Sequence, residues 1–62
     1  MNRLAETRKA KGLTQEQLAA LTGISRPYIS RIESGKQIVY SNRTMESLAK
    51  ALGEPIEHIF FK

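Results

Sequence analysis

The chain of 62 residues has no cysteine, no tryptophan, one histidine and only two prolines. Without cysteine it forms neither disulfides nor thiolate metal sites, and one histidine is too few to build a zinc site. We therefore predict no metal site and no cofactor. No apolar run approaches the roughly 20 residues of a membrane span, and the first residues lack the apolar core of a signal peptide. These absences predict a single soluble, cytoplasmic domain over residues 1–62.

Positive charge is unevenly distributed along the chain. The formal net charge is +4, and the whole excess lies before residue 37. Residues 1–36 contain seven basic side chains against three acidic ones, whereas residues 37–62 contain three of each. An excess of this kind is expected where a protein faces a polyanion such as nucleic acid. Charge alone does not decide the function, because many basic domains bind no anion.

Apolar residues recur at helical spacing in five segments, and glycine, proline or a capping residue bounds each of them. The segments run from Leu4 to Gly12, from Thr14 to Gly23, from Ser25 to Ser34, from Arg43 to Leu52 and onward from Pro55. No alternating strand pattern, internal repeat or low-complexity stretch interrupts them. The sequence therefore predicts an all-α fold.

The second and third segments carry signals for the places where helices begin. Thr14 and Gln17 have the spacing of a capping box, in which each side chain bonds to the backbone of the other residue. Because a residue before proline avoids helical backbone, either Ser25 or Arg26 caps the helix that contains Pro27. The inward face of the second helix is expected to comprise Leu18, Ala19, Leu21 and Thr22.

The same two segments have the spacing of a helix-turn-helix unit over about residues 14–34. Gly23 lies in the turn, where backbone with positive φ strains every residue except glycine. The small core between the two helices is expected to contain Leu18, Ile24, Ile29 and Ile32, with the small Ala19 at their crossing. Thr22 departs from the common pattern, which has a branched aliphatic residue there.

At this point the chain resembles the Cro/repressor family of helix-turn-helix regulators, also called the Xre-like family. The residues that carry the resemblance are TRKAKGLTQEQLAALTGISRPYISRIESGK and then MESLAKALGEPIEHIF. The resemblance implies a compact five-helix fold of the lambda-repressor type, with helices two and three as the reading unit. It also implies a transcriptional regulator that binds double-stranded operator DNA as a homodimer on a roughly palindromic site. A repressor or a restriction-modification controller is the expected type.

The resemblance assigns roles to particular side chains. The exposed, base-reading face of the third helix would comprise Arg26, Pro27, Ser30 and Arg31. Phosphate contacts would come from Gln15, Ser25, Tyr28, Lys36 and Arg43. Arg8 and Glu33 match a pair that forms an internal salt bridge in the family. The alternatives are that the two arginines are solvated or contact phosphates, since arginine suits both guanine and phosphate, and that Tyr28 only packs on the domain. Arg8 and Glu33 could also be two unconnected surface charges.

A dimer interface is expected in the neutral C-terminal part, because two basic faces repel each other. This part carries apolar residues that the monomer core does not require, namely Ile38, Val39, Tyr40 and Phe61. Burying them between two copies would stabilise a chain that is short for an independent domain.

Other functions remain to be weighed against DNA-binding regulation. An antitoxin of a toxin–antitoxin operon uses the same domain, but 62 residues leave little room for a toxin-binding segment. A protein-interaction adaptor with this fold would have lost the basic and polar face that is retained here. An enzyme is not expected, because the chain has no nucleophile with a base, no paired carboxylates and no phosphate-binding glycine loop. No small-molecule effector site is evident.

Overall fold

The computed structural model describes residues 2–35 and 40–60. The helices are α1 (Leu4–Ala10), α2 (Gln15–Thr22), α3 (Arg26–Glu33), α4 (Asn42–Leu52) and α5 (Ile56–Phe60), and no strand occurs in this part of the chain. The predicted all-α fold is confirmed. The longest helix has 11 residues, and isolated helices of this length are marginal in water, so packing against the other helices must hold each one in place.

Side chains cap the start of α2 and α3 as local chemistry requires. The Thr14 hydroxyl accepts a hydrogen bond from the Gln17 amide N–H at 3.0 Å, and the Gln17 side-chain oxygen accepts one from the Thr14 N–H at 2.8 Å. This is the predicted capping box. At α3 the cap is Ser25, so Arg26 and Pro27 occupy the first helical turn. Arg26 therefore adopts helical backbone although a proline follows it.

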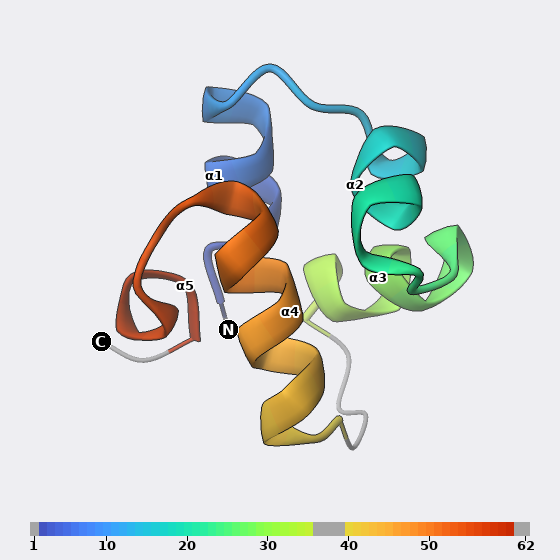
Figure 1. Cartoon of the computed structure of the whole chain (residues 1–62). Helices are drawn as coiled ribbons and strands as arrows, with labels where there is room; N and C mark the ends of the chain where they lie inside the picture. Colours follow the sequence, from blue (N-terminus) through green and yellow to red (C-terminus); the bar gives the residue numbers. More distant parts are fainter. Residues whose placement is uncertain (1, 36–39, 61–62) are drawn as a thin grey trace.

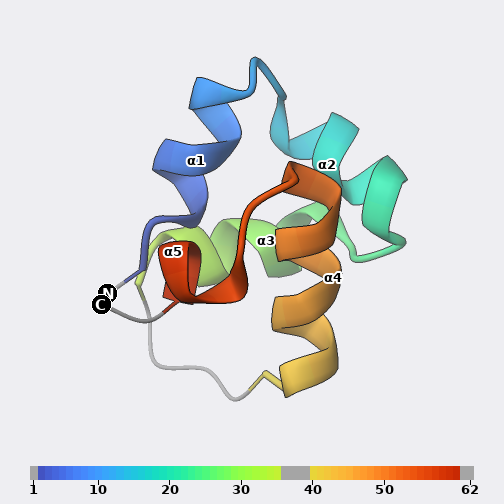
Figure 2. The same ribbon diagram turned by 60° about the vertical axis from the view of Figure 1, so that its left-hand side comes forward.

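The core draws side chains from all five helices. Its buried residues are Leu4, Leu18, Ile29, Ile32, Leu48, Ala49, Leu52 and Ile59. Figure 1 shows α4 in the centre, with α1 and α5 on one side and α2 and α3 on the other. Figure 2 shows α3 running across the molecule below α1 and α2. The arrangement leaves one side of α3 uncovered by its neighbours.

The expectation that Leu21 faces inward is wrong. Its side chain is 62% exposed, whereas Leu18 is completely buried. The core side of α2 is set by Leu18, Ala19 and Thr22, which lie close together at about 100° per residue, and Leu21 lies beyond the edge of that arc. The apolar character of Leu21 therefore does not contribute to the core.

No helix within the described residues is long and apolar enough to span a membrane.

Candidate nucleic-acid interface

The turn between α2 and α3 is closed by Thr22 and Gly23. Gly23 has φ 75°, a left-handed conformation that glycine adopts without strain. The Thr22 hydroxyl donates to the Leu18 carbonyl at 2.9 Å and accepts from the Ile24 N–H at 3.2 Å. An aliphatic residue, common at this position, cannot make either bond. Thr22, which departs from the common pattern, thus joins the end of α2 to the turn by hydrogen bonds. In the sequence, only its hydroxyl group indicated this role.

The exposed side of α3 carries all four residues predicted to read bases. Arg26, Pro27, Ser30 and Arg31 are each exposed. With about 100° per residue they fall within an arc of about 140° on the helix surface. The opposite side of the helix bears Ile29 and Ile32, which are buried in the core. The helix is therefore anchored by one face, and on the other it presents an exposed arc of two arginines, a serine and a proline.

A buried ionic network fixes the end of α3 to α1 and α2. The Arg8 guanidinium donates to both oxygens of the Glu33 carboxylate, from Nε to Oε2 at 2.7 Å and from Nη2 to Oε1 at 3.1 Å. Its Nη1 donates to the Leu13 carbonyl at 2.7 Å. The two side chains are only 10% and 7% exposed. Hydrogen bonding to Glu33 raises the pKa of Arg8 above its ordinary value, so the guanidinium remains charged.

Gln15 joins this network from the first position of α2. Its Nε2 donates at 2.9 Å to Oε1 of Glu33, the oxygen that also accepts from Arg8 Nη2. One proton of the amide is used in this bond, and Nε2 carries a second. Glu33 therefore orients a half-buried side chain at the start of a helix, where backbone N–H groups favour anions. The structure thus brings Glu33 together with Arg8 and Gln15, which precede it by 25 and 18 residues in the sequence.

The other predicted phosphate contacts are placed as follows. The Ser25 hydroxyl caps α3 by accepting from the Tyr28 N–H at 3.3 Å, which leaves its proton to donate outward. Tyr28 is half-buried and packs against the core, in agreement with the alternative of a packing role. Arg43 is exposed in the first turn of α4. Lys36 lies outside the described residues.

Of the residues predicted for the dimer interface, only Tyr40 lies within the described part of the chain. Its ring is half-buried and contacts the ring of Phe60, with centroids 5.7 Å apart and an interplanar angle of 51°. Ile38, Val39 and Phe61 lie outside the described residues. Tyr40 therefore contributes to packing within one chain and still presents part of its surface.

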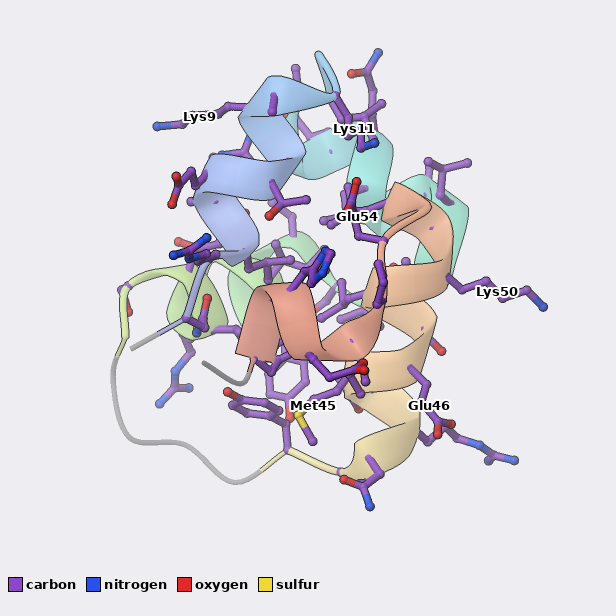
Figure 3. All side chains as sticks on the ribbon, turned by 90° about the vertical axis from the view of Figure 1, so that its left-hand side faces the viewer. Lys9, Lys11, Met45, Glu46, Lys50 and Glu54 are labelled. Carbon is purple, nitrogen blue, oxygen red and sulfur yellow. The ribbon has the colours of Figure 1, made fainter. Side chains whose placement is uncertain are left out.

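A second charged cluster, which sequence reasoning missed, lies between α1 and the link from α4 to α5. Lys11 Nζ lies 3.0 Å from Glu54 Oε2, and His58 Nδ1 lies 3.1 Å from Glu54 Oε1. Figure 3 shows Lys11 and Glu54 pointing toward one another, while Lys9 projects away. Hydrogen bonds from His58 and then from Lys11 lower the pKa of Glu54. Only the His58–Glu54 spacing of four residues was a local signal.

Two helices joined by a short turn, with one exposed basic arc on the second helix, define a DNA-binding helix-turn-helix domain. The model of the helix-turn-helix family matches residues 4–59. The chain therefore belongs to the helix-turn-helix family.

Several known proteins are similar to this chain. The HTH-type transcriptional repressor RghR of Bacillus subtilis (strain 168) is 42% identical over 59 residues, which are 95% of this chain and 44% of RghR. The competence pilus inhibition repressor of Acinetobacter baylyi is 43% identical over 86% of this chain and 47% of its own length. The chain thus spans less than half of the length of either repressor.

A solved structure is similar over most of its own length as well. The crystal structure of the restriction-modification controller protein C.AhdI from Aeromonas hydrophila superposes with a TM-score of 0.82 and 43% sequence identity. The match covers 90% of this chain and 83% of that one. The expected five-helix fold of this family is confirmed.

Proposed function

We propose that α3 enters the major groove of DNA and reads base edges with Arg26, Pro27, Ser30 and Arg31. The observation that carries this proposal is the exposed arc of α3 opposite a buried one. An α-helix fits the major groove, and the fork of arginine matches O6 and N7 of guanine. The serine hydroxyl can donate or accept, whereas the proline offers only apolar contact. The anchored side of α3 holds this surface in a constant orientation.

Phosphate contacts flank the base-reading arc in this proposal. Gln15 donates its second amide proton to a phosphate from the start of α2. Ser25 and Tyr28, at the start of α3, contact phosphates of the DNA backbone. Lys36 and Arg43 neutralise further phosphates. These contacts fix the register of the protein on the duplex and carry no sequence information themselves.

The active species is proposed to be a symmetric homodimer on an approximately palindromic operator. One reading helix covers only a few base pairs, and a second copy doubles both the sequence read and the phosphate contacts. The two α3 helices would lie about one DNA turn, roughly 34 Å, apart. The interface would comprise Ile38, Val39, Tyr40 and Phe61, all in the part of the chain that carries no net charge.

The proposed cellular role is transcriptional regulation in the cytoplasm, of the repressor or restriction-modification controller type. The two similar repressors are each matched over less than half of their own length. The controller protein, in contrast, is matched over 83% of its length. Similar proteins thus support both types, since RghR is named as a repressor and C.AhdI as a restriction-modification controller. No catalytic role is assigned to any residue.

Selection of bound duplexes from a random oligonucleotide pool tests the DNA part of this proposal. The selected duplexes should share an inverted repeat whose half-sites are centred about 10 base pairs apart. Selection of unrelated sequences would contradict sequence-specific recognition. Selection of one half-site without a repeat would contradict the dimer.

Sedimentation of the free protein tests the assembly separately. The wild-type chain should sediment as a dimer, and Phe61→Asp should shift it to the monomer, because a carboxylate would be buried in an apolar contact. Lys50→Gln, at an exposed position of α4, provides a control outside the proposed interface. A dimer that Phe61→Asp leaves intact would place the interface elsewhere.

A further inference from the structure

The side chain of Asn2 bonds to two different helices. Its Oδ1 accepts from the Leu4 N–H at 2.9 Å, at the start of α1. Its Nδ2 donates to the Ile32 carbonyl at 2.9 Å, in the last turn of α3 and 30 residues away in the sequence. The Ile32 carbonyl also accepts from the Gly35 N–H at 3.2 Å, just past the end of α3, so Asn2 supplies a second donor that comes from a distant part of the chain. Asn2 thus begins one helix and provides a donor for the end of another.

The next residue attaches this short segment to a third helix. The Arg3 N–H donates to the Ile59 carbonyl of α5 at 2.8 Å, and the Arg3 carbonyl accepts from Thr7 in the first turn of α1 at 2.9 Å. The backbone beside Asn2 is therefore held on both sides, so its amide reaches Ile32 from a fixed position. Figure 2 shows α1 and α5 lying on the same side as the end of α3.

Asn2 and Arg8 hold consecutive residues of α3. The amide of Asn2 bonds to the backbone of Ile32, and the guanidinium of Arg8 bonds to the side chain of Glu33. Arg31 directly precedes this pair and is exposed on the reading arc. A change in the position of the Ile32 carbonyl would displace the backbone from which Arg31 extends.

We propose that Asn2 is a positioning residue for DNA recognition, which sets the end of α3 and thereby the reach of Arg31 into the groove. This inference rests on the proposed role of α3 as the reading helix. A residue that served only α1 would need just an acceptor for the Leu4 N–H, and aspartate or serine would suffice. The asparagine amide is required because one group must accept at α1 and donate to α3.

Two substitutions of Asn2 separate these roles. Asn2→Asp keeps the acceptor for Leu4 and removes the donor to Ile32, whereas Asn2→Ala removes both. Ala51→Gly is the matched control, since glycine weakens α4, which carries none of the base-reading residues, without changing the charge. Affinities for the selected operator and for a scrambled duplex are measured by fluorescence anisotropy, and circular dichroism gives the folded fraction with which each value is corrected.

Both variants of Asn2 should lower the ratio of operator affinity to scrambled-DNA affinity by about three- to tenfold, the effect expected of one lost hydrogen bond. The added negative charge in Asn2→Asp weakens binding to both duplexes alike and does not change the ratio of the two affinities. The ratio therefore reports the position of the end of α3. Ala51→Gly should keep the wild-type ratio. An unchanged ratio in Asn2→Asp would overturn the inference and leave Asn2 only as an acceptor for the Leu4 N–H of α1. A wild-type protein without preference for any duplex would overturn the proposed function as well.

Discussion

Glu33→Gln tests the buried network that orients α3 and Gln15. Three N–H groups converge on the two carboxylate oxygens of Glu33, two from Arg8 and one from Gln15. In the amide one oxygen becomes an NH₂ group, which faces a donor instead of accepting from it. The Arg8 guanidinium, in a residue only 8% exposed, loses the charge that compensates its own.

The expected loss of stability is large for a domain of this size. Removing one partner of a buried ion pair costs about 3–5 kcal/mol. A domain of 62 residues has a free energy of unfolding of about 3–9 kcal/mol in total. Glu33→Gln should therefore lose from about a third of this free energy to all of it. Urea unfolding followed by far-UV circular dichroism at low temperature measures the difference from wild type.

The double variant Arg8→Met, Glu33→Leu separates the contribution of the ion pair to the free energy of unfolding from the cost of leaving one charge unpaired. Apolar side chains of similar size often replace a buried ion pair without loss. The double variant should recover most of the stability that Glu33→Gln loses, although the Leu13 carbonyl also loses its donor. A loss below about 1 kcal/mol in Glu33→Gln, the value of an exposed pair, would refute the reasoning. So would a double variant as unstable as the single one.

Three further predictions concern other parts of the molecule. Arg43→Ala should reduce the slope of log K against log salt by about 0.9 per subunit, the value of one phosphate contact, and so by about 1.8 for the dimer; an unchanged slope in binding titrations would remove Arg43 from the interface. Thr22→Val should lower the free energy of unfolding by about 1 kcal/mol, since the turn loses its hydroxyl bonds, and equal urea midpoints would contradict this. His58 and then Lys11 lower the pKa of Glu54 in the folded chain, so this group adds stability above its unfolded-state pKa and loses it as pH falls through the folded-state value. Glu54→Gln should therefore make stability less dependent on pH in the acidic range, and an unaltered dependence would contradict the pairing.

The sequence determined the elements that rest on local chemistry. Thr14 and Gln17 predicted the start of α2 because a capping box needs only residues three apart. The choice between Ser25 and Arg26 could not be made locally, because the bias of a residue before proline opposes the bias of serine for a cap. The structure favours Ser25, whose hydroxyl reaches the Tyr28 N–H.

Tertiary contacts account for what the sequence did not predict. Leu21 is as apolar as a core residue. Only the packing of α4 beside α2 shows that its side chain lies outside the buried face of α2. The bonds of Asn2 to Ile32 and of Lys11 to Glu54 join segments 30 and 43 residues apart along the chain, and no local pattern marks either pair. The contact of Arg8 with Glu33 was expected from the family resemblance, not from spacing.

Arg31 on α3 is proposed to read a base pair, and one measurement tests this role most directly. Binding of wild type and Arg31→Ala is compared on the selected operator and on duplexes that each carry one base-pair change. Wild type should lose about 1–3 kcal/mol at the base pair that Arg31 contacts in each half-site. Arg31→Ala should lose that discrimination at this base pair alone and keep it at all others. A variant that binds every duplex more weakly by the same factor would contradict the account, because Arg31 would then contact only phosphate.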